Sequence, residues 1–198
     1  MIELANYKGR EQAYVKHVFL ATYLERLVHK TASKFSRVVY IDGFAGPWQS
    51  ASERFEDTSF GIALGALRRA KASWKNFGRE VQMSAHLVEQ SPEAYAKLSR
   101  VPPLYPDIEV VTHRGDFSTL VPGILSRIPR DAFGFAFVDP KGWRLSMEAL
   151  KPLLVRPNSE MIFNFMFEFI NRAAGPIYHC DPALDMVAMS LRTASATR

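Results

Sequence analysis

Cysteine is nearly absent from this sequence of 198 residues, which contains only Cys180. A single cysteine cannot form a disulfide within the chain, and no cysteines and histidines cluster at the spacing of a zinc site. These absences argue against a disulfide-stabilised secreted domain and against a metal centre. The simplest compartment for such a chain is the reducing cytoplasm.

Long apolar runs are also absent. No stretch approaches the ~20 apolar residues that a transmembrane helix needs. The first ten residues mix charged and polar side chains and lack the apolar core of a signal peptide. Hydrophobic residues make up 47% of the chain and charged residues 23%. This composition is typical of a globular domain without a membrane partner.

The two common phosphate-binding glycine motifs are missing as well. The sequence has no G-x-x-x-x-G-K-[ST] for a triphosphate and no complete G-x-G-x-x-G for the pyrophosphate of a dinucleotide. The first absence argues against a P-loop nucleotide hydrolase. The second disfavours an NAD-dependent oxidoreductase, which we keep as a third hypothesis.

Basic residues exceed acidic residues by 25 to 20, giving a net charge of +5. This balance permits a nucleic-acid partner without requiring one. The densest basic stretch is interspersed with alanines and with Leu67. We interpret it as the solvated face and end of a helix, in preference to a patch that follows a phosphate backbone. It contains Arg68, Arg69, Lys71, Lys75 and Arg79.

Apolar patterns of two kinds alternate along the chain. Short β-rich runs predict strands at 38–41, 83–88, 108–112, 133–138 and 161–165. Three- and four-residue spacing predicts helices at 12–29, 60–72, 92–99, 119–127 and 147–154. Ser91 and Ser118 are the expected N-caps of the third and fourth helices. The alternation predicts a three-layer α/β fold with a doubly wound, mostly parallel sheet.

Polar residues stand at the ends of all five predicted strands. Sheets of this kind bind ligands beyond the carboxyl ends of their strands. Acidic, amide or glycine residues at every end therefore argue for one ligand-binding edge. The residues are Asp42-Gly43, Glu89, Gly115-Asp116, Asp139-Pro140 and, within the fifth strand, Asn164.

The first of these ends is a glycine turn. Gly43 and Gly46 lie three residues apart, directly after a buried strand, and glycine lets a ligand approach the backbone. An ordinary strand-to-loop turn would also use glycine. Because the phosphate motifs are absent and S-adenosylmethionine has no phosphate, that cofactor is the favoured ligand. Asp42, Gly43, Ala45 and Gly46 are the residues predicted to hold it.

Two further acids are candidates for the cofactor site. Glu89 is placed to accept both ribose hydroxyls, as the acid after the second strand does in dinucleotide folds, or to favour the start of the next helix. Its distance from the glycine turn exceeds the usual ~20 residues, so Trp48 to Ser59 must be an inserted loop. Asp116 is placed to bind the adenine amino group or to cap a helix.

Asp139-Pro140-Lys141-Gly142-Trp143 is the best catalytic candidate. Proline turns the chain, so the Asp139 carboxylate can orient an amine for attack on the sulfonium methyl, with Trp143 stacked on a base. The alternative is a strand-end turn with a core tryptophan. Lys16 and His17, on the first predicted helix, are placed to reach the cofactor edge, although a helical histidine more often serves packing.

With these residues placed, the chain resembles the three-Cys-motif partner (TcmP) family. The motifs span most of residues 12–172. They are Lys16-His17, Tyr23-Leu24, the segment Tyr40 to Pro47, Asp139 to Gly142, Asn164-Phe165-Met166 and Ile170-Asn171-Arg172. The family is similar to class I S-adenosylmethionine-dependent methyltransferases. Its Lys-His helix and Asp-x-x-Ala-Gly turn resemble those of ribosomal-RNA adenine-N6 methyltransferases.

The resemblance implies a bacterial or mobile-element protein that works beside a three-cysteine partner of iron–sulfur type. The chain departs from the pattern at Asp139-Pro140-Lys141-Gly142, where adenine-N6 methyltransferases have Asp-Pro-Pro-Tyr, and at Trp48, where the family often has glycine. Family members also extend beyond residue 198. We therefore expect one domain with a helical segment 1–32, a Rossmann-like core 36–172 and a tail 173–198. We also expect the sheet of this domain to be shortened or truncated at the C-terminus.

The leading hypothesis is a methyltransferase that uses S-adenosylmethionine to modify a base of RNA or DNA, or another amine. Asp139 and Pro140 would orient the acceptor nitrogen. The alternative is a non-catalytic protein of the same fold that serves as a partner of a three-cysteine iron–sulfur protein.

Overall fold

The computed structural model describes residues 7, 9, 11–47, 50, 52–140 and 145–164. The predictions for Trp48, for Lys141 to Trp143 and for all residues after Asn164 lie outside these ranges. The expected tail and its truncation are therefore not part of the fold described below.

Helices and strands alternate through the described chain. The α-helices are α1 (Glu11–Lys34), α2 (Ser59–Asn76), α3 (Pro92–Leu98), α4 (Phe117–Arg127) and α5 (Met147–Leu154). The strands are β1 (Arg37–Asp42), β2 (Gln82–Glu89), β3 (Glu109–Arg114), β4 (Phe133–Val138) and β5 (Ser159–Phe163), and a 3-10 helix, η2 (Pro102–Leu104), precedes β3. No helix in the described ranges is both long and apolar enough to cross a membrane.

The five strands form one sheet in the order β3-β2-β1-β4-β5. Every neighbouring pair is parallel, and central β1 pairs with β2 on one side and with β4 on the other. The chain builds outward from β1 to β3 and then returns to the other side of β1, which makes the sheet doubly wound. Folds of this kind form a crevice where the strand order reverses, beyond the carboxyl ends of β1 and β4.

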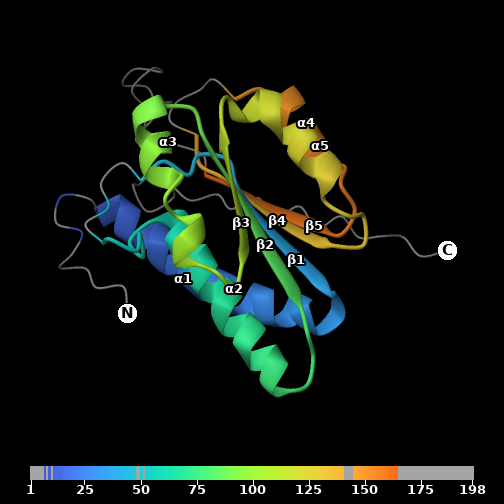
Figure 1. Cartoon of the computed structure of the whole chain (residues 1–198). Coiled ribbons are helices and arrows are strands. Elements are labelled where there is room, and N and C mark those ends of the chain that lie inside the picture. The colour runs from blue at the N-terminus through green and yellow to red at the C-terminus, as the bar shows by residue number, and fades with distance from the viewer. Residues whose placement is uncertain are drawn as a thin grey trace, which may run out of the picture.

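Helices cover both faces of the sheet (Figure 1). Successive residues of a strand point to opposite faces, so β1 contributes to both cores. Val38 and Tyr40 belong to the core under α1 and α2, whereas Val39 and Ile41 belong to the core under α4 and α5. All six residues of β4 are buried, as expected of an inner parallel strand. The predicted three-layer α/β architecture is confirmed.

All five predicted strands and all five predicted helices are present, with differences at their ends. β5 ends at Phe163, so Asn164 follows the strand rather than lying in it. α1 continues to Lys34, five residues beyond the predicted end at 29. Ser118 lies inside α4 and is not its N-cap. The N-cap of α4 is Asp116, whose carboxylate accepts the Thr119 N–H at 3.2 Å.

The described part of the predicted insertion is a loop, because α2 begins only at Ser59. This loop packs directly on the first turn of α2. A Cβ added to Gly61 would lie 1.9 Å from the carbonyl oxygen of Phe55. The Tyr105 hydroxyl donates to the Arg54 carbonyl at 3.1 Å, and the Thr58 hydroxyl caps α2 by accepting the Gly61 N–H at 3.0 Å. The loop is therefore fixed beside the end of β1.

Candidate functional site

The polar residues predicted from the strand ends lie along one edge of the sheet. Because all described strands are parallel, their carboxyl ends face the same way. In spatial order, this edge presents Asp116 after β3, Glu89 at the end of β2, Asp42 at the end of β1, Asp139 after β4 and Asn164 after β5. Lys16 reaches the same edge from α1 through its contact with Asp139.

Asp42 is fully buried, with 0% of its surface exposed. Its Oδ2 accepts hydrogen bonds from Tyr40 at 2.9 Å and from the Ser59 hydroxyl at 2.8 Å. Its Oδ1 accepts the Phe44 N–H at 3.1 Å. The carboxylate thus ties the glycine turn to β1 and to the start of α2. The Asp42 carboxylate thus lies behind the glycine turn, and its predicted contact with a cofactor stays a prediction.

Burial raises the pKa of Asp42 to about 6 from its usual value near 3.8. The hydrogen bonds from Ser59, Phe44 and Tyr40 oppose that rise, because they stabilise the ionised form, and the charge of Asp139 adds to it. At acidic pH the Asp42 carboxyl under the glycine turn is therefore mostly neutral. Neither Tyr40 nor Ser59 was assigned this role from the sequence.

The backbone of the glycine turn is held between two strands. The Gly43 N–H donates to Phe137 at 3.0 Å, and the Ala45 N–H donates to Val88 at 2.8 Å. A Cβ on Gly43 would meet the ring of Phe117 at 3.1 Å. Gly43 thus allows close packing over an aromatic ring, without a positive φ. Ala45 is buried, whereas Gly46 is partly exposed at the edge.

Glu89, at the end of β2, uses only one of its carboxylate oxygens in a hydrogen bond within the described ranges. The residue is only 6% exposed, and its Oε1 accepts the Ser91 N–H at 2.6 Å, at the start of α3. Its Oε2 has no hydrogen-bond partner within the described ranges. This oxygen is not fully buried, so it can accept a hydrogen bond from a ligand or from water. Oε1 therefore has the contact expected of a glutamate at a helix start, and Oε2 is available to a ligand.

Asp116 is exposed, and its side chain caps α4 as described above. This geometry fits the capping alternative, and an exposed carboxylate can also contact a ligand at the end of β3. The preceding Gly115 has a φ of 148°, a conformation that strongly favours glycine, and its N–H donates to Glu89 O at 3.0 Å. The β3 end is thereby held against the β2 end.

Asp139 is the point where three elements meet. Its Oδ2 accepts a hydrogen bond from the ammonium group of Lys16, and its Oδ1 accepts the Asn164 amide at 2.7 Å. The Lys16 and Asp139 side chains are 25% and 19% exposed. Pro140 is buried directly after the carboxylate. The sequence singled out Asn164 as polar but assigned it no partner.

His17 is only 8% exposed and packs against the N-terminal segment. Its Nδ1 lies 2.9 Å from the Tyr7 hydroxyl, and the two rings meet edge to face. This arrangement fits the packing alternative for a helical histidine. Lys16, its neighbour in sequence, is the member of the pair that reaches the strand ends.

The basic residues of the stretch 68–79 mainly contact other residues of the chain. Arg68 pairs with Asp107 at 2.9 Å, and the backbone carbonyl of Asp107 accepts from Lys71. Arg69 pairs with Glu25 of α1 at 2.7 Å. These contacts fit the interpretation of the stretch as a helix face, and they favour it over a patch that follows phosphates.

A pair of histidines, His86 and His113, lies on the neighbouring strands β2 and β3. Nδ1 of His86 is 3.0 Å from Nε2 of His113, and the rings stack with centroids 5.3 Å apart. Burial lowers the pKa of His86 to about 4, with further contributions from the charges of His113 and Arg127. No group of three or more His, Cys, Asp or Glu side chains in the described ranges is arranged to hold a metal.

We predict that His86→Gln reduces the loss of stability in acid. The unfolded histidine titrates near 6.5 and the folded one near 4, so the unfolded state gains the proton first and stability falls as pH drops through this window. The wild type should lose on the order of 2 kcal/mol more than the variant between pH 7 and pH 4. Urea unfolding at several pH values measures this difference.

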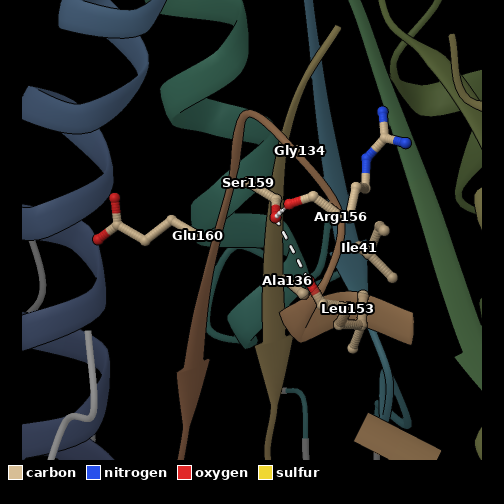
Figure 2. Close-up of a pocket in the computed structure, with 7 residues that line it drawn as sticks. All are labelled: Ile41, Gly134, Ala136, Leu153, Arg156, Ser159 and Glu160. Carbon is tan, nitrogen blue, oxygen red and sulfur yellow. Dashed lines mark hydrogen bonds between the residues drawn. The ribbon is translucent and has the colours of Figure 1, made fainter. Parts of the chain in front are cut away.

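A separate recess lies beside α5 at the start of β4 and β5 (Figure 2). Ser159 bridges it by donating to the carbonyls of Leu153 and Arg156, at 3.3 and 2.6 Å. Arg156 is 7% exposed, and its Nε has no hydrogen-bond partner in the described structure. None of the predicted site residues lines the recess. Its lining is Ile41, Gly134, Ala136, Leu153, Arg156, Ser159 and Glu160.

The fold and the edge define an α/β protein with a five-stranded parallel sheet and a polar cluster at the carboxyl ends of its strands. No family model and no curated protein matches the chain. The contacts at this edge are therefore the basis for the function proposed below.

Proposed function

We propose that this chain is a class I S-adenosylmethionine-dependent methyltransferase acting on an amine. The observation that carries the proposal is the Oε2 of Glu89, at the end of β2: the residue is only 6% exposed, and within the described ranges this oxygen accepts no hydrogen bond although it is not fully buried. A ribose hydroxyl supplies the donor that this oxygen lacks. The neighbouring glycine turn, with Gly46 partly exposed at the edge, supplies a surface for the rest of the cofactor.

The order of the strands supports this placement. Across the edge, Asp116 stands at β3, Glu89 at β2, the glycine turn at β1 and Asp139 at β4. The parts of the cofactor follow the same order, from adenine through ribose to the sulfonium that carries the methyl group. Neighbouring strands lie ~4.8 Å apart, so a molecule that spans three strand spacings fits this edge.

This arrangement supports methyl transfer in which the protein acts by positioning the acceptor nitrogen. An acceptor nitrogen needs its lone pair directed at the methyl carbon, and an anionic oxygen that accepts its N–H holds it in that direction. Asp139 is an oxygen acceptor of this kind, held from β5 by Asn164. Pro140 ends the strand and fixes the backbone behind the carboxylate.

Calorimetric titration with S-adenosylmethionine tests the cofactor site. Glu89→Gln keeps the size of the side chain but replaces a charged acceptor with a neutral one, and we expect affinity to fall about 10- to 100-fold. Glu93→Gln, an exposed acid in the first turn of α3, is the matched control and should bind like the wild type. The proposal fails if the wild type shows no saturable binding, or if NAD binds in preference.

A non-catalytic role is the second candidate, and one contact favours it. Both oxygens of Asp139 already accept hydrogen bonds, from Lys16 and from Asn164. A chain of this kind would bind the cofactor and assemble with a partner, of which a three-cysteine iron–sulfur protein is the kind that the resemblance implies. Cofactor binding without methyl transfer to RNA, DNA, protein or the chain itself would establish this role.

A further inference from the structure

The ammonium group of Lys16 occupies the place where the proposed function puts the acceptor amine. It donates to Oδ2 of Asp139, while the amide of Asn164 donates to Oδ1. Lys16 lies on α1 and Asp139 after β4, 123 positions apart in the sequence. The contact therefore results from the tertiary fold and not from local helix geometry.

The surroundings of Lys16 suit an aliphatic amine. Its side chain is 25% exposed and that of Asp139 is 19% exposed, so the pair is shielded but still in contact with water. The partners are a carboxylate and an amide, which together bind a group rich in N–H donors.

The strand order places the methyl group on the same side. With ribose on Glu89 at the end of β2, the sulfonium, one carbon beyond the ribose ring, lies over the end of β1 or toward β4. β4 is the neighbour of β1 on the side away from β2. The methyl group therefore faces the strand end that carries Asp139 and its bound Lys16.

We propose that Lys16 is a methylation site of the chain itself, modified within one molecule at the Asp139 and Asn164 pair. This inference rests on the proposed function, and it names an aliphatic lysine amine as the acceptor class. The Nζ first loses one proton to water at its exposed side. The lone pair then forms the N–CH₃ bond, the S–CH₃ bond breaks, and its electron pair remains on sulfur. The products are S-adenosylhomocysteine and an N-methyl-lysine ammonium that keeps two protons.

The test uses the full chain incubated with S-adenosylmethionine that carries a deuterated methyl group. Peptide mass spectrometry should place one labelled methyl on Lys16. The rate should be first order and independent of protein concentration, because donor and acceptor sit in one molecule.

Two variants sharpen the result. Lys16→Arg keeps a cation for Asp139 but removes the ε-amine, and we expect at least a 10-fold loss of incorporated label. Lys30→Arg replaces an exposed lysine on the same helix and should label like the wild type.

Cofactor binding is measured on the same samples by calorimetry. Saturable binding without label on Lys16 overturns the inference and leaves the cofactor site standing. Label spread over exposed lysines and unchanged in Lys16→Arg also overturns it, as does transfer to added RNA or DNA while Lys16 stays unmodified. Absence of binding removes the proposed function and this inference together.

Discussion

Replacing Gly61 with alanine should destabilise the fold by more than about 3 kcal/mol, the upper range for overpacking. The new Cβ would lie 1.9 Å from the Phe55 carbonyl oxygen and 2.7 Å from its carbon, and both atoms belong to the backbone. The loop would have to leave the first turn of α2, with loss of the Thr58 cap. Thermal and urea unfolding measure the change.

Gly65→Ala is the matched control in the same helix. A Cβ there would meet only the end of the Arg69 side chain, at 3.2 Å. Alanine favours an interior helix position over glycine by about 1 kcal/mol, so this variant should be neutral or more stable. Equal stability of the two variants would show that the loop does not pack on α2 as described.

The Asp42→Asn variant should change how stability depends on pH. The folded pKa of about 6 exceeds the unfolded value near 3.8, so the folded state holds the proton more firmly. The resulting stabilisation is complete below pH ~4 and is lost as pH rises through 6. Relative to Asp42→Asn, the wild type should lose about 3 kcal/mol over this interval.

The amide is a suitable replacement because the Tyr40 and Ser59 hydroxyls can accept as well as donate. Asp131→Asn, at a mostly exposed carboxylate that pairs with Arg37, is the control and should follow the wild-type profile. A constant difference between wild type and Asp42→Asn from pH 4 to pH 7 would contradict the expectation. Urea unfolding in a single buffer series provides the comparison.

The architecture was predictable because the buried strands of a parallel sheet have a clear apolar pattern in this sequence. A strand buried on both faces must be continuously apolar, and Phe133 to Val138 has this property. The end of β5 was misplaced because apolar residues stand on both sides of Asn164, so the sequence pattern does not mark an end at Phe163. The cap of α4 was misassigned because Asp116 and Ser118 are both good N-caps, and only backbone geometry selects between them.

The edge of the sheet was predictable, but the partners of its residues were not. The alternation of strands and helices brought Asp42, Glu89 and Asp139 to one end. Their hydrogen bonds differ: Asp42 accepts from Tyr40 and Ser59, whereas in the described part of the chain Glu89 accepts only from Ser91. Contacts between residues far apart in sequence, such as the one between Lys16 and Asp139, leave no local pattern.

The position of β1 has a consequence during synthesis of the chain. β1 is made first but pairs with β4, which follows about ninety residues later. At ribosomal rates of 5–20 residues per second, one edge of β1 stays open for roughly 5 to 20 seconds. A nascent chain with an open apolar edge is a substrate for chaperones and prone to pair with other chains. The contacts of Asp139 with Lys16 and Asn164 also form only after β4 and β5 have been made.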